Sequence, residues 1–309
     1  MFASSSRTSP HIPSPDLKTR VVVWLLRLVK SLRSTHRLHS VRKYAAQTDK
    51  RKLVPPEGIS HIHKYVAGLP CDILTKDNAT LTVLHFYGGG YCIRMPKTEL
   101  PAIAKLCDRI DAQAYLPWYR LAPENKFPAG LDDCFAFYQH LLEIGIEPSR
   151  IVLSGSSAGG GNVLSLLMML KKAALPMPAC GVMHSPAGDA LMLADSWIEN
   201  ERKDPFFKLS DVLMFGKHFV GGVERADPLL NVSLMEDFSG YPPLYISVSD
   251  KEVLRDVGVL AHEKAVLAGV ESTLDVFPGG FHSMPILFSS NQTRYIWNRV
   301  EQFISQHTG

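Results

Sequence analysis

The clearest chemical pattern in the chain is Gly155-Ser156-Ser157-Ala158-Gly159. An apolar, strand-like run at residues 150–154 precedes it, and an apolar helical stretch at residues 162–170 follows. Strand, G-x-S-x-G and helix form the context of a nucleophile elbow, a tight and strained turn that exposes the central hydroxyl. The flanking glycines fit this turn, because a Cβ there would collide with the neighbouring strand or helix. The pattern predicts Ser157 as a nucleophile.

A serine hydroxyl is a poor nucleophile until a base removes its proton, and the base needs a carboxylate to fix its tautomer. After an elbow of this type, the acid and then the histidine follow along the chain, each on a loop after a strand. His282 fits the position of the base, because it follows the last predicted strand, residues 273–277, on a loop with two glycines. The sequence therefore predicts His282 as the general base.

The acid has more than one candidate. Asp250 and Glu252 both follow a predicted strand, residues 244–249, at the end where ligand-facing groups gather in parallel sheets. Asp256 lies further on, inside the next predicted helix, where it is typical of a surface or capping charge. The residues by themselves leave Asp250 and Glu252 open.

A glycine triplet, Gly88-Gly89-Gly90, follows directly on the predicted strand 80–87. A tetrahedral oxyanion needs backbone N–H groups aimed at one point, and losing one such donor typically costs about 10²–10³ in rate. Glycines supply these groups without side chains in the way. A triplet alone is also typical of a flexible turn. Beside an elbow, it favours an oxyanion hole.

Strand-like and helix-like segments alternate from residue 80 onward. This alternation predicts an α/β fold with a mostly parallel central sheet and helices on both faces. Almost 60 residues separate strands 180–185 and 244–249, too many for a simple crossover, so this insertion, with a helix at 209–220, is a candidate lid. The other predicted strands are 80–87, 112–119, 150–154 and 273–277, and the other helices are 97–110, 130–144, 159–174, 253–268 and 293–305.

The composition is that of an ordinary globular protein, with 46% hydrophobic and 20% charged residues in a chain of 309. This length suits one large α/β domain, with or without a small subdomain. No apolar run approaches the roughly 20 residues of a membrane span and no signal peptide is evident, so we expect no integral membrane segment and a cytoplasmic location. Five scattered cysteines without a C-x-x-C are expected to be reduced thiols.

The N-terminal part is strongly basic. Residues 1–52 carry twelve Lys or Arg against two Asp, whereas residues 53–309 carry 21 basic and 28 acidic side chains. A solvated helix face with a flexible tail is the simpler interpretation, and contact with a membrane surface or organelle targeting is the alternative.

We expect the first 15 residues to be disordered and residues 17–44 to form an amphipathic helix. Such a helix must pack its apolar face against something. That face is predicted to be Val22, Leu25, Leu26, Val29 and Leu32, with Arg20, Arg27, Lys30 and Ser34 turned away from it.

Further motifs occur in order between about residues 80 and 285. They are Gly88-Gly89-Gly90-Tyr91, Tyr119-Arg120-Leu121-Ala122-Pro123-Glu124, Gly155-Ser156-Ser157-Ala158-Gly159-Gly160, Tyr241-Pro242-Pro243-Leu244, Leu254-Arg255-Asp256 and Pro278-Gly279-Gly280-Phe281-His282. In this combination the chain resembles the hormone-sensitive-lipase-type family of α/β-hydrolases, carboxylesterases that often carry an H-G-G-G oxyanion motif. The resemblance implies the α/β-hydrolase fold with a helical cap.

The resemblance also implies roles for single residues. They are Ser157 as nucleophile, Glu252 as acid, His282 as base, and the N–H groups of Gly89, Gly90 and Ala158 as oxyanion hole. Glu252 is favoured because Glu252-Val253-Leu254 keeps the motif of a family subgroup without a gap, whereas counting from the strand end favours Asp250.

One position departs from the family pattern. Tyr87 stands where the family has the motif histidine, and His85 lies two residues upstream. In the family that histidine supports the oxyanion loop by hydrogen bonding and does no chemistry itself. We expect the hydroxyl of Tyr87 to substitute for it.

The implied domain division has four parts. A disordered tail at 1–16 precedes N-terminal cap helices at 17–52, the α/β-hydrolase core comprises 53–190 and 240–309, and a cap insertion occupies 191–239. The N-terminal helix and the insertion are expected to pack together over the pocket. The apolar face of the helix would then be pocket wall rather than a membrane anchor.

These observations predict a serine carboxylic-ester hydrolase that acts on a moderate-sized apolar ester through an acyl-enzyme. No metal or cofactor is implied, the partner is a small-molecule ester substrate, no nucleic acid is expected, and a homodimer is left open. An acyl transferase or cyclase of natural-product biosynthesis is an alternative, because there the same acyl-enzyme meets a nucleophile other than water. A non-catalytic small-molecule receptor on this fold is disfavoured, because Ser157 and His282 are both intact.

Overall fold

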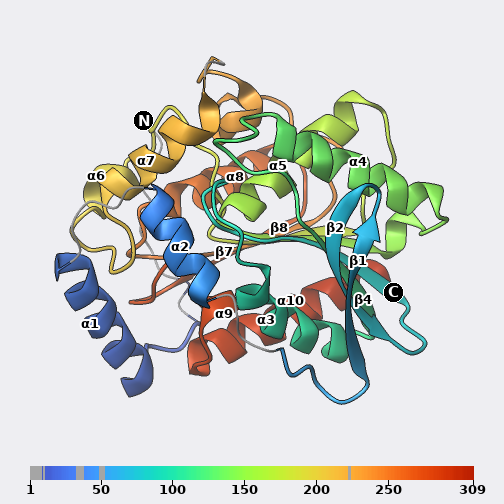
Figure 1. Ribbon diagram of the computed structural model, residues 1–309, viewed down its shortest axis with the longest axis horizontal. Coiled ribbons are helices and arrows are strands. Elements are labelled where there is room, and N and C mark those ends of the chain that lie inside the picture. Colours follow the sequence, from blue (N-terminus) through green and yellow to red (C-terminus); the bar gives the residue numbers. More distant parts are fainter. Residues whose placement is uncertain (1–8, 10, 33–37, 49–52, 222–223) are drawn as a thin grey trace.

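The computed structural model describes residues 9, 11–32, 38–48, 53–221 and 224–309, and in this part of the chain eight strands form one sheet (Figure 1). The strand order is β1-β2-β4-β3-β5-β6-β7-β8. Strands β3 to β8 run parallel, whereas β1 and β2 form an antiparallel hairpin at one edge. The strands are Ile59–Val66 (β1), Leu69–Lys76 (β2), Leu81–Phe86 (β3), Ala112–Pro117 (β4), Ile151–Ser156 (β5), Cys180–His184 (β6), Leu244–Ser249 (β7) and Ser272–Phe277 (β8).

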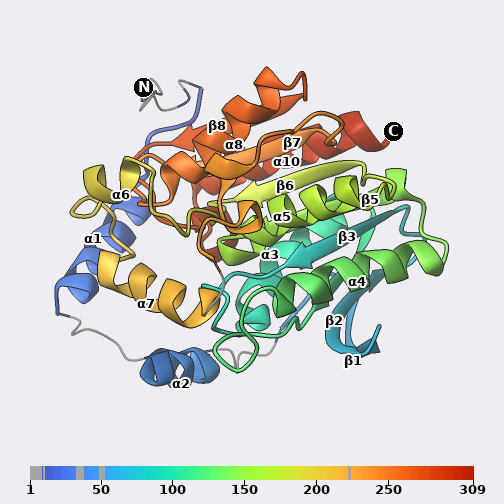
Figure 2. The same cartoon turned by 90° about the horizontal axis from the view of Figure 1, so that it is seen from above.

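Helices pack against both faces of the sheet (Figure 2). The apolar residues of α4, α5 and α8 form the core on one face, and those of α3 and α10 form the core on the other. The helices are Leu17–Leu32 (α1), Leu38–Thr48 (α2), Pro96–Arg109 (α3), Ala129–Glu143 (α4), Ala158–Lys172 (α5), Ser196–Glu199 (α6), Leu209–Val220 (α7), Arg255–Leu267 (α8), Met284–Leu287 (α9) and Asn291–Thr308 (α10). The predicted α/β fold is therefore confirmed.

The middle of the sheet sets the position of the site. Every residue of β3, β5, β6 and β7 is buried, as expected for parallel strands covered by helices on both faces. From β3 the chain goes to β4 on one side of the sheet and then returns to β5 on the other. Ligands of open parallel sheets bind where the strand order reverses in this way, beyond the carboxyl ends of the strands.

The hairpin of β1 and β2 has no clear signal in the sequence. β1 lies at the edge of the sheet, and most of its residues after Ile59 are exposed. Because an exposed strand buries neither face, its sequence does not need to alternate apolar and polar residues, and it does not. Its turn is formed by Ala67 and Gly68, both with positive φ (51° and 76°). Only the second of these is a residue type that predicts such a turn.

The predicted tail, residues 1–16, makes contacts with the core in the part that the structure describes. Ser9 donates a backbone hydrogen bond of 3.0 Å to β8, and the carbonyl of Pro13 accepts one of 2.9 Å from a side chain of α10. Residues 1–8 and 10 lie outside the described residues. The segment has the composition of a flexible tail, but long-range hydrogen bonds hold it against the core.

The N-terminal helical region forms two helices, α1 and α2, instead of the one expected over residues 17–44. The predicted position of Ser34 and the end of the expected cap segment, residues 49–52, lie outside the described residues. α2 packs through Leu38 and Ala45 against residues that follow the glycine triplet and against α7. It therefore lies beside the insertion.

The expected apolar face of α1 is wrong in phase. Val22 and Leu26 pack against the core, but Leu25, Val29 and Leu32 are exposed. Ten of the sixteen residues of α1 are apolar, so apolar side chains surround most of the helix. Spacing alone then cannot select the stripe that faces the protein.

Two further sequence expectations concern membranes and thiols. Within the described residues, no helix has both the length and the apolar character to cross a bilayer. All five cysteines are free and buried, in agreement with the expected reduced thiols.

Candidate active site

Ser157 lies on the sharp turn between β5 and α5. β5 ends at Ser156 and α5 begins at Ala158, so Ser157 alone makes the turn, with φ 52° and ψ −121°. A residue with a Cβ rarely adopts such a positive φ, and strain of this kind is typical of functional sites. A Cβ on Gly159 would lie 1.7 Å from the carbonyl oxygen of Phe86, so the turn packs directly on the end of β3. The backbone has the form of a nucleophile elbow.

His282 and Glu252 form a buried hydrogen-bonded pair on the loops after β8 and β7. Nδ1 of His282 lies 2.7 Å from Oε2 of Glu252, and the two side chains are 3% and 0% exposed. The other carboxylate oxygen, Oε1, accepts hydrogen bonds from the backbone N–H of Ser249 (2.7 Å) and the hydroxyl of Ser185 (2.9 Å). Because a carboxylate only accepts, Nδ1 carries the proton, and the orientation of the ring is fixed.

Asp250, the other candidate acid, lies apart from the imidazole. One of its carboxylate oxygens accepts a 2.7 Å hydrogen bond from the backbone N–H of Gly279, and the other lies 3.0 Å from Nζ of Lys251. Asp250 therefore holds the loop that carries His282. The structure places Glu252, and not Asp250, beside the histidine.

The second ring nitrogen of His282 has no partner. Nε2 is buried and forms no hydrogen bond to any residue that the structure describes, Ser157 included. The rings of Phe207 and Phe206 lie 4.8 and 5.9 Å from the imidazole, centroid to centroid. Because Nδ1 carries the proton, Nε2 presents a lone pair. A buried lone pair without a donor is a group that can accept a proton from a bound molecule.

The position of the two phenylalanines depends on a buried carboxylate. Asp204 accepts hydrogen bonds from the backbone N–H groups of Phe206 (2.6 Å), Phe207 (3.0 Å) and Val253 (2.9 Å). Burial raises the pKa of Asp204, and these backbone donors oppose the rise. The segment 204–207 and the loop of Glu252 are thus held together around the imidazole.

The glycine triplet follows β3 and reaches the same place. Gly89 and Gly90 have φ of 132° and 58°, and a Cβ on Gly89 would lie 2.2 Å from the carbonyl oxygen of Ile93. Only glycine fits this loop without strain. The backbone N–H groups of Gly89, Gly90 and Ala158 donate no hydrogen bond to other described residues. These donors are available to a bound anion.

Glu99 connects the glycine loop to the elbow. Its Oε1 accepts hydrogen bonds from the backbone N–H of Gly88 (2.7 Å) and the hydroxyl of Ser156 (2.8 Å). Its Oε2 lies 2.7 Å from Nε2 of His85, whose Nδ1 lies 3.0 Å from Oγ of Ser154. All five residues are buried. One carboxylate therefore fixes the spacing between the end of β3 and the end of β5.

The sequence analysis did not predict the role of Glu99, although the position of Glu99 on its helix gives a weak signal. Glu99 shares the helical phase of Ile103 and Leu106, which are buried, so a carboxylate stands on an apolar face. The expected substitute, Tyr87, does not support the loop: its ring stacks on Tyr119 at 4.7 Å, and among the described residues its hydroxyl makes no hydrogen bond to the glycine loop.

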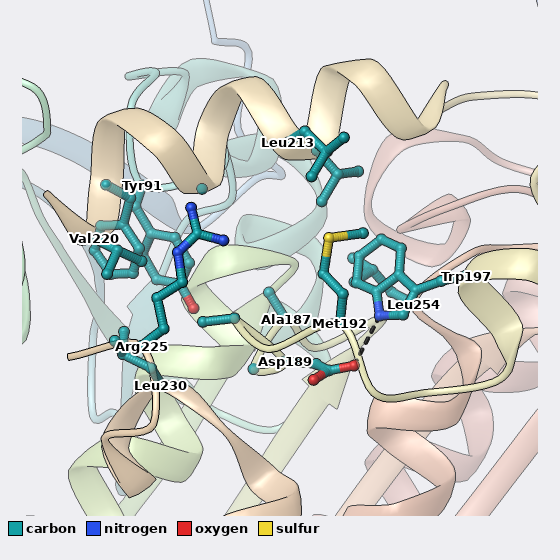
Figure 3. Close-up of a pocket in the computed structure, with 15 residues that line it drawn as sticks. Tyr91, Ala187, Asp189, Met192, Trp197, Leu213, Val220, Arg225, Leu230 and Leu254 are labelled. Atoms are coloured by element: carbon teal, nitrogen blue, oxygen red, sulfur yellow. Dashed lines mark hydrogen bonds between the residues drawn. The ribbon is translucent and has the colours of Figure 1, made fainter.

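A mainly apolar cavity of about 90 Å³ lies beneath α7 (Figure 3). Its wall includes Ala187, whose N–H donates to the carbonyl of Ser157 (2.9 Å), and Tyr91, which follows the glycine triplet. The remaining lining residues are Gly188, Asp189, Ala190, Met192, Trp197, Val212, Leu213, Gly216, Phe219, Val220, Arg225, Leu230 and Leu254. Ser157 and His282 themselves are not among the lining residues, so the cavity meets the elbow through Ala187.

The insertion supplies most of the cavity wall, and α1 and α2 supply none of it. Asp189 accepts a 2.7 Å hydrogen bond from the indole N–H of Trp197, which fixes that ring (Figure 3). Arg225 is the one basic side chain among the lining residues. Within the described residues, no cluster of His, Cys, Asp and Glu side chains is arranged to hold a metal ion.

Known proteins share much of this sequence and fold. Residues 83–286 match a family model described as alpha/beta hydrolase fold. The chain is 32% identical over 201 residues to an acetyl-hydrolase of Streptomyces hygroscopicus (65% of this chain, 67% of that protein). It is 30% identical over 209 residues to an esterase of Acinetobacter venetianus (67% and 69%).

Solved structures cover more of the chain. A hormone-sensitive lipase from a metagenome library superimposes with a TM-score of 0.88 and 29% identity over 96% of this chain and 100% of that one. The esterase EstE5, soaked with p-nitrophenyl butyrate, gives a TM-score of 0.86 and 28% identity over 95% and 99%. The similarity therefore includes the N-terminal helices and the insertion as well as the sheet.

Proposed function

The chain belongs to the α/β-hydrolase family, among the hormone-sensitive-lipase-type carboxylesterases, and on this premise we propose that it hydrolyses esters through Ser157, His282 and Glu252. The observation that carries the proposal is the buried His282–Glu252 pair, whose Nε2 is left without a partner at the end of the sheet where the elbow lies. Another buried histidine, His184, also leaves its Nε2 without a partner among the described residues, but its Nδ1 contacts only the hydroxyl of Ser247. The carboxylate on Nδ1 is therefore what distinguishes His282 as a base.

In the first half of the reaction, Oγ of Ser157 attacks the carbonyl carbon of the ester, and its proton moves to Nε2 of His282. The C=O pair of electrons moves to oxygen, and the N–H groups of Gly89, Gly90 and Ala158 stabilise this oxyanion. The imidazolium is stabilised by the adjacent carboxylate. It returns the proton to the alkoxide as the C–O bond breaks, and an acyl-enzyme remains.

In the second half, water takes the place of the alcohol. Nε2 of His282 removes a proton from the water as its oxygen attacks the acyl carbon. The same three N–H groups stabilise the second oxyanion. The proton then passes to Oγ of Ser157 as the acyl bond breaks, and the carboxylic acid leaves.

The cavity indicates the size of the acyl group. A protein cavity of about 150 Å³ takes benzene. The 90 Å³ cavity that meets the elbow through Ala187 therefore suits a smaller apolar group, an acyl chain of a few carbons. The similarity to an acetyl-hydrolase supports a short acyl chain. In this proposal, the insertion with α7 is the cap over the cavity. α2 packs against α7 but does not line the cavity.

Carboxamide substitutions at the two candidate acids test the assignment of the triad. In Glu252→Gln the amide oxygen is held by the N–H of Ser249 and the hydroxyl of Ser185, so the NH₂ group faces Nδ1 of His282 and favours the wrong tautomer. We expect kcat to fall by about 10²–10⁴-fold. Asp250→Asn is the matched control, because its amide oxygen still accepts from Gly279; kcat should change by less than about threefold. Turnover of p-nitrophenyl acetate and thermal unfolding are measured for both. A reversed order of the two effects, with both variants folded, would assign the acid to Asp250.

The size of the cavity predicts the chain-length preference. With p-nitrophenyl acetate, butyrate, octanoate and dodecanoate, kcat/KM should be highest at four carbons or fewer and fall about tenfold by eight. Met192→Ala enlarges the cavity and should move the optimum to longer chains, and Ser157→Ala gives the blank. A kcat/KM that rises steadily to dodecanoate would contradict this location of the acyl group.

Glu99 should act as a positioning residue. Glu99→Ala removes the bridge from Gly88 to Ser156, and kcat should fall by about ten- to a hundredfold with little change in KM, because the misplaced donors matter only in the transition state. Glu99→Gln keeps an oxygen for both donors and should recover most of the loss. Glu143→Ala, an exposed acid on α4, is the control. If Glu99→Ala lowers the melting temperature but leaves kcat unchanged, Glu99 supports only the fold.

A further inference from the structure

The outer face of α1 is an exposed apolar surface. Leu17, Trp24 and Leu32 are 77%, 62% and 78% exposed, although they are among the largest apolar side chains of the helix. The other exposed apolar residues of α1 are Val21, Leu25, Leu28 and Val29. Because these positions recur every three or four residues, they form one continuous stripe, which we call the α1 stripe.

The α1 stripe is not needed to attach the helix. The opposite side of α1 is already packed: Thr19 and Val23 are buried, and Val22 and Leu26 contact the core. Nζ of Lys30 also donates to carbonyl oxygens of the segment 201–204. The helix is therefore held by one face, while the other face presents apolar side chains to solvent. Monomeric proteins rarely expose a large apolar surface unless that surface binds a partner or a membrane.

Charge beside the stripe indicates what it binds. α1 contains no acidic residue, and Arg20 and Arg27 are exposed along one edge of the stripe. Lys43 and Tyr44 of the neighbouring α2 are exposed as well. Apolar side chains that include a tryptophan, flanked by basic side chains, are typical of helices that lie in the interface of an anionic membrane.

We propose that α1 binds the surface of an anionic lipid bilayer, lying in the plane of the interface with the α1 stripe inserted. A second copy of the chain is a weaker occupant, because a symmetric pairing of α1 would bring the exposed Arg20 and Arg27 of both copies together without an acidic side chain on the helix to pair with them. Anionic headgroups supply the missing negative charge.

This docking also gives the site a fixed place relative to the membrane. α1 lies beside the segment that leads from α6 to α7 (Figures 1 and 2), because Lys30 donates to the carbonyls of Glu201 and Asp204. Asp204 holds Phe206 and Phe207, which contact His282. A bilayer bound to α1 therefore lies on the same side of the molecule as the insertion that covers the site.

Flotation of the full chain with lipid vesicles tests the proposal. Vesicles of phosphatidylcholine alone are compared with vesicles that contain about one third phosphatidylglycerol. The wild type should float with the anionic vesicles. Trp24→Gln with Leu28→Gln should lower the bound fraction at least about tenfold, and Arg20→Gln with Arg27→Gln should lower it about tenfold on anionic vesicles only. The control, Val266→Gln with Leu267→Gln, removes two exposed apolar residues of α8 and should bind like the wild type.

Three results would overturn the proposal. The wild type could float with neither kind of vesicle, or the α1 stripe variants could bind vesicles as well as the wild type does. The third is a bound fraction that falls equally in the α1 stripe variants and in the α8 control. Sedimentation velocity is run in parallel. If the stripe variants convert a dimer to a monomer and leave vesicle binding unchanged, the stripe is a contact between copies. Binding is measured without turnover, so a chain that binds vesicles but hydrolyses no ester would defeat the proposed function and leave the membrane surface standing.

Discussion

The active site depends on the close approach of β3 to the first turn of α5. A Cβ on Gly159 would lie 1.7 Å from the carbonyl oxygen of Phe86, so this crossing exists only because a glycine stands there. It brings the glycine loop after β3 beside Ser157 at the end of β5. Glu99 then fixes the glycine loop relative to the elbow, because its Oε1 accepts hydrogen bonds from the N–H of Gly88 (2.7 Å) and the hydroxyl of Ser156 (2.8 Å). Pre-positioned N–H donors of this kind contribute most when they need no rearrangement during the reaction.

The sequence predicted those parts of the site that local pattern determines. The elbow, the glycine loop and the loop histidine are each recognisable within a few residues, and the alternation of strands and helices predicts the sheet that joins them. The choice between Glu252 and Asp250 needed the path of the loop, because Asp250 contacts Gly279 while Glu252 reaches the imidazole. Glu99 could not be assigned, because its partners lie on three separate elements.

The N-terminal helix illustrates a different limit of sequence analysis. In α1, apolar residues surround most of the helix, so the apolar face that the sequence predicted is wrong in phase. The structure shows that its packed side is narrow and that its wider apolar side is exposed. The cavity is instead enclosed by the insertion. The insertion thus lines the cavity, whereas α1 presents the exposed apolar surface. The two segments meet at residues 201–204.

The most direct test of the proposed chemistry is a crystal structure of the protein after reaction with p-nitrophenyl diethyl phosphate. The account predicts phosphorus bonded to Oγ of Ser157, with a phosphoryl oxygen about 3 Å from the N–H groups of Gly89, Gly90 and Ala158. Nε2 of His282 should then face the position of the leaving group. A fully folded protein that forms no adduct, or an adduct on any other residue, would contradict the account.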